Sequence, residues 1–140
     1  MSILGSIRAF IDECPFLDEF RTAVNVNFLD EGEKSYMIEP SVTQPVVKKY
    51  TDGSSVRQFN FVFASREYFG RDVLENLDID TFYEHFSEWL EECSREKKLP
   101  VMEEDKQARK IKATTNGYLY NADQTKAQYQ IQCQLIYYQR

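Results

Sequence analysis

The side chains that most often perform acid–base or nucleophilic chemistry are sparse in this sequence. Its single histidine, His85, lies between Glu84 and Phe86, and a Ser-His-Asp or Cys-His arrangement would have to include it. No nucleophile motif accompanies this histidine, and its place at the flank of an apolar helical stripe is typical of a boundary residue. We therefore predict no catalytic residue.

Carboxylates are abundant, but they come mostly as adjacent pairs, whose side chains point in different directions on a helix or strand. Such pairs are typical of solvated surface. A carboxylate pair for glycoside or proton chemistry stays open, although nothing in the sequence favours it. The groups are Asp12-Glu13, Asp18-Glu19, Asp30-Glu31-Glu33, Glu91-Glu92 and Glu103-Glu104-Asp105.

Motifs that bind metals or cofactors are also absent from the sequence. The sequence has no Cys-x-x-Cys, no pair of histidines and no calcium-loop spacing, so we predict no metal site. Its 5 glycines are scattered rather than gathered before a helix, which predicts no phosphate-binding loop and no cofactor. Cys14, Cys93 and Cys133 lie far apart, and each falls on an apolar stripe. We expect reduced core thiols.

Length and composition predict one domain over residues 1–140. The chain is 42% hydrophobic and 14% aromatic, which is ample for a core.

The net charge of −6 argues against binding nucleic acid through phosphates, although an acidic surface lets DNA pass without sticking. The opening residues, MSILGSIRAFIDECP, are too short and polar to span a membrane and lack the basic start of a signal peptide. We expect a soluble, unexported protein without a membrane partner.

Helical periodicity predicts two amphipathic helices. The first covers residues 2–14, with Ser2 as a possible N-cap and Pro15 as its stop. The second covers residues 81–98, with Asp80 as N-cap. The apolar stripes consist of Ile3, Ile7, Phe10, Ile11 and Cys14 in the first helix, and of Phe82, Phe86, Trp89, Leu90 and Cys93 in the second.

Period-two alternation predicts strands before the second helix. Residues 22–30 are predicted to form a hairpin with 35–40 around DEGEK, and residues 46–50 one with 56–64 around the Asp-Gly of TDGSS. Phe59, Phe61 and Phe63 share one face of the longest strand. Residues 66–78 are predicted to contain one or two irregular helical turns.

After the second helix, residues 101–110 are charged and are predicted to form an exposed loop. Residues 111–115 and 118–120, separated by Asn-Gly, and the final segment 127–139 are predicted as strands. This order of elements predicts an α+β fold. We expect a single domain with a largely antiparallel sheet and two main amphipathic helices packed on one of its faces.

The final strand, AQYQIQCQLIYYQ, carries the most distinctive pattern. Ala127, Tyr129, Ile131, Cys133, Leu135 and Tyr137 alternate with glutamines where lysine and glutamate are usual. Glutamine can be covered by a neighbour without burying ions. We therefore nominate a subunit or partner interface, with a merely solvent-exposed face as the alternative. Charging Gln130 and Gln132 is expected to weaken assembly and leave the monomer folded. The candidate interface consists of Gln128, Gln130, Gln132, Gln134 and Tyr138.

The order of several segments resembles a known family. These are a Phe-rich strand running into SREYFG, the helix segment FSEWLEE, the LP that follows it, and NGYLY before a last strand ending IYYQ. Together, from Phe59 to Gln139, they resemble the small tail-terminator or tail-completion proteins of long-tailed phages and of prophage-derived tail particles of Gram-positive bacteria. Minor capsid and head–tail joining proteins of the same phages are a related resemblance.

The resemblance implies a structural virion protein with no active site. Tail terminators are similar α+β folds that form a homo-hexameric ring. The ring caps the last ring of tail tube protein, stops its polymerisation and offers a surface to the head–tail connector protein, while DNA passes through the lumen. Assembly would take place in the cytoplasm of the bacterial host, and the mature protein would lie in the tail or neck of the virion.

Three alternatives stay open beside the tail terminator. A head–tail connector or other neck protein is close to it. A small α+β ligand-binding domain or enzyme belongs to a different class, because apolar cavities do not show in a sequence. A tail-tube protein is disfavoured, since two amphipathic helices in 140 residues do not suit a mostly stranded fold.

Overall fold

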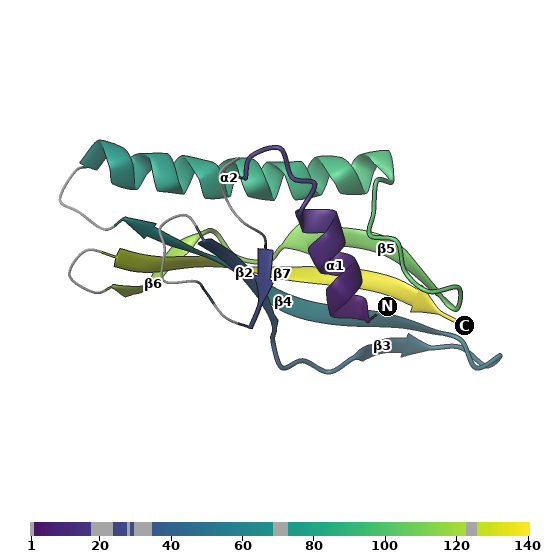
Figure 1. Ribbon diagram of the computed structural model, residues 1–140. Coiled ribbons are helices and arrows are strands. Elements are labelled where there is room, and N and C mark those ends of the chain that lie inside the picture. The colour runs from purple at the N-terminus through teal and green to yellow at the C-terminus, as the bar shows by residue number, and fades with distance from the viewer. Residues whose placement is uncertain (1, 18–23, 28, 30–34, 69–72, 123–125) are drawn as a thin grey trace.

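Two helices lie over one face of a seven-stranded sheet in the computed structural model of the chain (Figure 1). The structure describes residues 2–17, 24–27, 29, 35–68, 73–122 and 126–140, with the backbone alone at 68 and 73–76. The elements are α1 (Ile3–Ile11), β1 (Val24–Val26), β2 (Ser35–Pro40), β3 (Val46–Lys49), β4 (Ser55–Tyr68), α2 (Val73–Glu96), β5 (Lys106–Ala113), β6 (Tyr118–Ala122) and β7 (Lys126–Gln139).

The sheet is built around the long antiparallel pair β4 and β7. These strands of 14 residues each pair along their whole length, from Ser55 opposite Gln139 to Tyr68 opposite Lys126. The order across the sheet is β1-β2-β4-β7-β5, with β3 also beside β4 and β6 also beside β7. All pairs except β1–β2 are antiparallel. The predicted α+β fold with a largely antiparallel sheet is confirmed.

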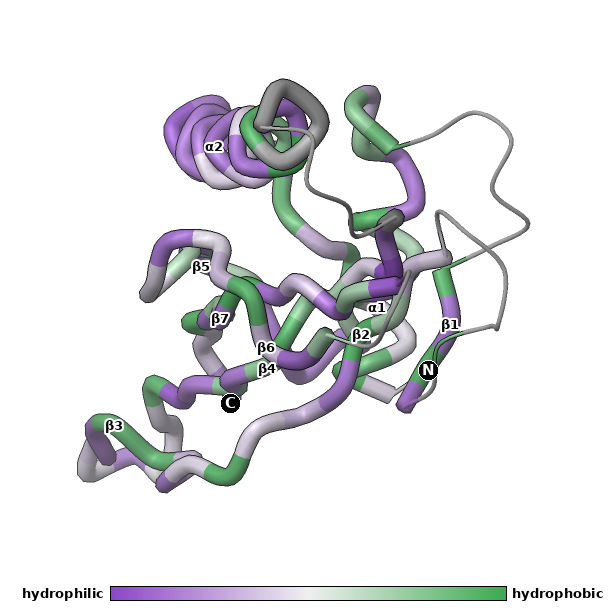
Figure 2. Tube along the Cα trace, turned by 90° about the vertical axis from the view of Figure 1, so that its left-hand side faces the viewer, coloured by the Kyte–Doolittle hydropathy of each residue, from purple (hydrophilic) through white to green (hydrophobic). Residues whose placement is uncertain are grey.

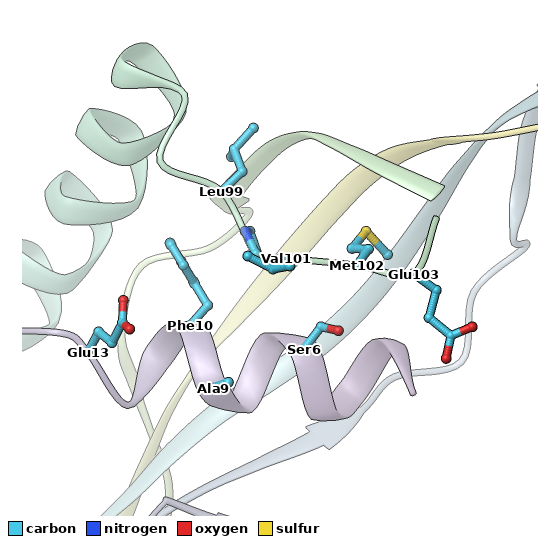
Figure 3. A pocket seen from close by; sticks show the side chains of 9 residues that line it. Ser6, Ala9, Phe10, Glu13, Leu99, Val101, Met102 and Glu103 are labelled. Carbon is cyan, nitrogen blue, oxygen red and sulfur yellow. The ribbon is translucent and has the colours of Figure 1, made fainter. Parts of the chain in front are cut away.

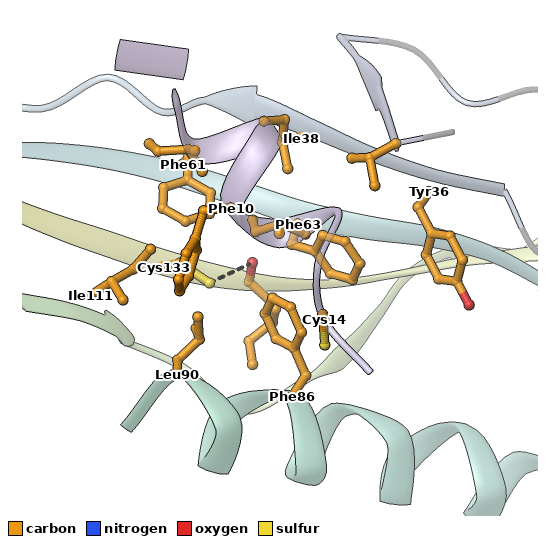
Figure 4. Close-up of a cluster of buried hydrophobic side chains, with 14 of the residues drawn as sticks. Phe10, Cys14, Tyr36, Ile38, Phe61, Phe63, Phe86, Leu90, Ile111 and Cys133 are labelled. Carbon is orange, nitrogen blue, oxygen red and sulfur yellow. Dashed lines mark hydrogen bonds between the residues drawn. The ribbon is translucent and has the colours of Figure 1, made fainter. Parts of the chain in front are cut away.

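The core lies between the helices and one face of the sheet (Figure 4). Phe61 and Phe63 of β4 are fully buried there, as the shared face of the phenylalanines predicted. The ring of Phe63 stacks on that of Phe86 from α2, with centroids 4.5 Å apart. Phe10 of α1 stacks on Trp89 of α2 at 4.9 Å, so both helices belong to one core. Figure 2, turned by 90°, shows α2 as a separate layer above the sheet.

Helix α1 begins as the sequence predicted and ends earlier. The Oγ of Ser2 accepts a hydrogen bond from the backbone N–H of Gly5 at 3.0 Å, which confirms Ser2 as N-cap. The helix stops at Ile11, before Pro15. Cys14 therefore lies beyond the helix, although its side chain is still buried. All three cysteines are free and buried, as expected of core thiols.

Helix α2 is longer than predicted, and its N-terminal boundary was wrong. It begins at Val73, so Asp80 is an exposed residue inside the helix and not its N-cap. Its fully covered positions are Ile79, Tyr83, Phe86, Leu90 and Cys93, whereas Phe82 and Trp89 are only partly buried. Lys97 adopts a left-handed conformation (φ 62°), and the N–H of Lys98 bonds to the carbonyl of Cys93 at 2.9 Å, which ends the helix.

The predicted hairpin between residues 22–30 and 35–40 was also wrong. Both segments contain strands, but β1 and β2 run parallel, with Val24 opposite Tyr36 and Val26 opposite Ile38. Asn27, in a left-handed conformation (φ 67°), ends β1. Alternation indicates that a segment is extended but carries no information on its direction. Phe28 and the whole turn segment DEGEK lie outside the described residues.

Two further boundaries differ from the predictions. Arg66–Tyr68 continues β4, where the sequence predicted irregular helical turns. Residues 106–110 belong to β5, where it predicted a loop, because pairing with β7 overrides the high charge of this segment. The β3–β4 hairpin is confirmed. Its turn places Gly53 at φ +92°, and the Asp52 carboxylate accepts hydrogen bonds from the N–H and the Oγ of Ser54.

Candidate functional site

All five nominated interface residues lie on the face of β7 that points away from the helices. We call this set, Gln128, Gln130, Gln132, Gln134 and Tyr138, the glutamine face. The alternate residues point into the core, where Ile131 and Leu135 are fully buried. Because β7 pairs with β4 along its whole length, the glutamine face continues across β4 through Asn60, opposite Gln134. The predicted assignment of the two faces is confirmed.

Three of the glutamines form a hydrogen-bonded network around Tyr118 of β6. The Nε2 of Gln130 donates to the Tyr118 hydroxyl at 2.7 Å, and that of Gln132 at 3.3 Å. The Nε2 of Gln128 donates to the Oε1 of Gln130 at 3.2 Å. Tyr118 lies opposite Gln130 across the β6–β7 pair, so the register of the two strands sets this contact. Hydrogen bonds between neutral side chains hold these glutamines in fixed positions without any charge.

The fourth glutamine forms a second network that reaches the β2–β3 connection. The Nε2 of Gln134 donates to the Oε1 of Gln58 on β4 at 2.7 Å. The Nε2 of Gln58 donates in turn to the carbonyl oxygen of Gln44 at 2.8 Å. The backbone of the same segment is held to β4, since Gln58 N–H bonds to the carbonyl of Pro45 at 2.8 Å. The segment from Gln44 to β3 is thereby positioned beside the glutamine face.

Tyr138 lies at the far end of the glutamine face, next to β5. The guanidinium carbon of Arg109 lies 5.2 Å from the centre of the Tyr138 ring, a cation–π distance. Arg109 was not predicted as a partner of Tyr138 because residue 109 was expected to lie in a loop, and Tyr118 was not predicted as a partner of the glutamines either. The Asn-Gly turn and the short segment after it were the available signal for Tyr118, because they place this tyrosine on a strand next to β7.

Exposure divides the glutamine face into positions that a partner can reach and one that it cannot. Gln130 is only 6% exposed, whereas Gln132 is exposed and Gln128, Gln134 and Tyr138 are half-buried. Beside Gln130, a small apolar cluster covers the same sheet face, with Ala64 fully buried. Its members are Met37, Val62 and Ala64, with Leu29 packed against them. Gln130 is therefore part of the folded monomer, and its burial argues against the expectation that it can be charged without harm to folding.

Residues that could support catalysis are not brought together in the described part of the chain. His85 is exposed, and its ring lies 5.3 Å from that of Phe16 in a tilted arrangement. Among the described residues, no group of three or more His, Cys, Asp or Glu side chains is placed to hold a metal ion. Burial raises the pKa of the Cys93 thiol and, more strongly, that of Cys133, which keeps both protonated.

An apolar groove of about 270 Å³ lies between α1 and the segment after α2 (Figure 3). Phe10 points from α1 towards this segment, in which Leu99 and Met102 line the groove. Its two carboxylates, Glu13 and Glu103, lie at opposite ends of the view. The groove offers apolar contact but no paired acid and base.

No protein-family model and no curated protein sequence matches the chain. No helix in the described residues has the length and apolar character needed to cross a membrane.

The side chains of the glutamine face are suited to recognising a partner. Its glutamines present amide donors and acceptors without charge, and Tyr138 adds an aromatic ring that Arg109 holds in place. Covering such a surface costs less than covering ions, because amides that find new hydrogen-bond partners carry a small desolvation penalty. Tyrosine and arginine are also the side chains enriched where protein surfaces meet. The arrangement suits a polypeptide partner.

Proposed function

We propose that this chain is a tail terminator of a long-tailed phage or of a phage-tail-like particle. Six copies form a ring that caps the last ring of tail tube protein, stops polymerisation and provides the surface that joins the head. The observation that carries the proposal is the glutamine face, an ordered and uncharged hydrogen-bonding surface on a rigid sheet. Charged residues are depleted at the centre of protein interfaces, so this surface suits stacking against copies of the chain and against a tube protein.

The placement of the family-like segments supports the proposal. The Phe-rich strand is β4, the FSEWLEE segment lies in α2, and the last two segments are β6 and β7. Since β4 and β7 pair along their full length and α2 packs on them, these segments together form the centre of the fold. The resemblance therefore covers one connected unit and not scattered pieces.

Two connections are proposed as contacts with the neighbouring rings. One is the segment between Pro40 and Pro45, where the Val42 side chain is fully exposed. The other is the segment 101–105, where Val101 is 85% exposed. Residues 106–110, first included with this second loop, belong to β5 and are held to β7. Loops on a rigid sheet are common positions for partner contacts, and exposed valines gain from being covered.

Tube polymerisation in the presence of the purified protein tests the function. We expect tube protein grown with this chain to stop at a length that depends on the ratio of the two proteins, with one ring at the tube end in electron micrographs. A head–tail connector would bind finished tails without changing tube length. A chain that stays monomeric and leaves tube length unchanged would contradict the proposal.

A further inference from the structure

The helix layer carries a strongly acidic outer surface. Among the described side chains, the exposed face of α2 bears seven carboxylates and one arginine, namely Asp78, Asp80, Glu84, Glu88, Glu91, Glu92, Glu96 and Arg95. Figure 2 shows this side of α2 as mostly hydrophilic. Asp80, Glu84 and Glu88 repeat every four residues, so their charges repel one another along the helix. Within the described chain these three form no ion pair, whereas Glu96 pairs with Lys98 at 3.1 Å.

The opposite side of the molecule is basic. Arg109, Lys110 and Lys112 of β5, which we call the basic band, border the glutamine face. Lys110 lies opposite Ile136 and Lys112 opposite Gln134, while Arg109 covers Tyr138. By register, Lys48, Arg66 and Lys126 lie on the same sheet face, and Glu39 is the one carboxylate that the described strands place there. The two layers of the molecule thus have opposite charge, although the whole chain is acidic.

Pairing with an added partner strand is blocked at Ile111 on the outer edge of β5. The Oγ of Ser94 in α2 donates to the carbonyl of Ile111 in β5 at 2.6 Å and accepts from its N–H at 3.0 Å. The helix thereby occupies the edge-facing backbone groups of Ile111, so an incoming strand could not pair through this residue. Lys110 and Lys112, which lie on the outer sheet face, are the groups of the basic band that can meet a partner.

We propose that the basic band of one copy docks on the acidic face of α2 of the next copy. This inference rests on the proposed ring and names the surfaces that close it. Charge complementarity argues for a second copy, because each copy carries both surfaces and the described residues leave Asp80, Glu84 and Glu88 of α2 without an ion pair. The spacing also matches, since residues two apart on a strand are separated by about 6.7 Å and residues four apart on a helix by about 6 Å. Lys110 and Lys112 can therefore meet Glu84 and Glu88 in register.

The geometry of this contact is head-to-tail. The two surfaces lie on opposite layers of one molecule, so the interface is heterologous and each copy can bind one neighbour on each side; such copies form a ring where the rotation between neighbours closes. Beside the basic band, Gln134, Ile136 and Tyr138 provide the uncharged centre of the contact. Charged groups at the border of such a centre set the register and the choice of partner.

Charge reversal tests the proposal. We expect Lys110→Glu/Lys112→Glu and, separately, Glu84→Lys/Glu88→Lys to weaken self-association at least about tenfold, because each variant brings like charges together. All four positions are exposed or half-exposed, so both variants should remain folded by circular dichroism. An equimolar mixture of the two variants should recover association, since reversed and unreversed surfaces then alternate around an even-membered ring. Sedimentation velocity at low salt measures all three samples.

Matched variants carry the same charge changes elsewhere. Lys49→Glu/Lys97→Glu and Asp12→Lys/Glu13→Lys change exposed residues outside both surfaces and should associate like the unaltered chain. If the chain forms rings that cap tubes but either reversed variant associates normally, or the mixture fails to recover, the docking proposal is wrong and the proposed function stands. If the unaltered chain never associates, alone or on tubes, both are wrong. Loss of binding to duplex DNA, in place of loss of self-association, would assign the band to nucleic acid and overturn the inference.

Discussion

Gly117 allows the connection between β5 and β6 to approach α2 closely. A Cβ atom at this position would lie 2.5 Å from both the Cβ and the Cγ of Tyr83. Tyr83 cannot retreat, because its hydroxyl lies 2.6 Å from the Oγ of Ser65 and donates to the carbonyl of Tyr129 at 2.9 Å. The glycine is therefore required by space at the point where the helix meets the sheet.

Replacing Gly117 tests this close approach. We expect Gly117→Ala to lower the free energy of unfolding by about 1–3 kcal/mol, because a side chain forced into a packed contact shifts its neighbours. Urea denaturation measures the change. Asn116→Ala, at the exposed neighbouring position, should be nearly neutral. Equal stability of the two variants would show that the connection can move away from α2 at little cost.

The buried thiol of Cys133 should make the fold sensitive to alkaline pH. Burial raises the pKa of Cys133 well above its usual range, so the folded thiol keeps its proton. The unfolded thiol loses its proton above about pH 8.5. Stability is therefore fully present below that pH and falls as the pH rises towards the folded pKa, by about 1.4 kcal/mol per pH unit for each such thiol.

A variant without this thiol isolates its contribution. Cys133→Ala should be less stable at neutral pH because of the cavity it leaves, yet its stability should fall less steeply between about pH 9 and 10. Denaturation curves recorded at several pH values give the two slopes. Parallel slopes for the two proteins would mean that Cys133 titrates alike in the folded and unfolded chains.

At the scale of elements, the attachment of β5 to α2 depends on one serine. Ser94 both donates to and accepts from the backbone of Ile111. Ser94→Ala should cost about 1–3 kcal/mol, because it leaves a part-buried N–H and C=O without their partner. The amide of Ile111 should also exchange with solvent faster than in the unaltered protein.

Hydrogen exchange distinguishes a local loosening of β5 from a loss of stability across the whole sheet. Hydrogen exchange followed by NMR should show faster exchange in β5 while the β4–β7 pair keeps its protection. Ser87→Ala, on the same helix and half-buried, serves as the control and should leave exchange in β5 unchanged. Uniformly faster exchange across the whole sheet would indicate that Ser94 has no special part in holding β5.

The elements that could be predicted from the sequence are those whose pattern is local. The alternation of β7 and the Asp-Gly turn of β3–β4 both depend on neighbouring residues, and both were found. The direction of β1 and the inclusion of residues 106–110 in β5 depend on long-range pairing with β2 and β7, which no local pattern contains. Asp80 was mistaken for an N-cap because aspartate suits that position, whereas the helix begins at Val73 and continues through Asp80.

In the candidate site, too, the features set by a local pattern could be predicted, and those set by long-range contacts could not. That four glutamines and Tyr138 share one face follows from alternation alone. Which of them a partner can reach does not, because the burial of Gln130 depends on Tyr118 and on apolar residues of β2 and β4. Arg109 became visible as a partner of Tyr138 only once β5 was placed beside β7.

For the whole molecule, one face of the sheet packs the core and we propose that the other serves assembly, so charge placed on the second face should separate the two roles. Gln132 is exposed, and its amide makes one long hydrogen bond of 3.3 Å to Tyr118. Gln132→Glu should therefore change the stability of the monomer by no more than about 0.5 kcal/mol. In a ring that covers this face, however, the new carboxylate would be buried without a partner, so association should weaken at least about tenfold.

Gln130→Glu is the matched contrast, because the same change is made at a position that the monomer itself covers. With 6% of its surface exposed, Gln130 would place a charge next to Ala64 and against the Tyr118 hydroxyl, and the monomer should lose about 1–3 kcal/mol. Thermal unfolding of dilute protein and sedimentation at high concentration measure the two effects separately. The glutamine face is an assembly surface only if Gln132→Glu impairs association while the monomer remains stable. If Gln132→Glu leaves association unchanged, the ring must be built from other surfaces.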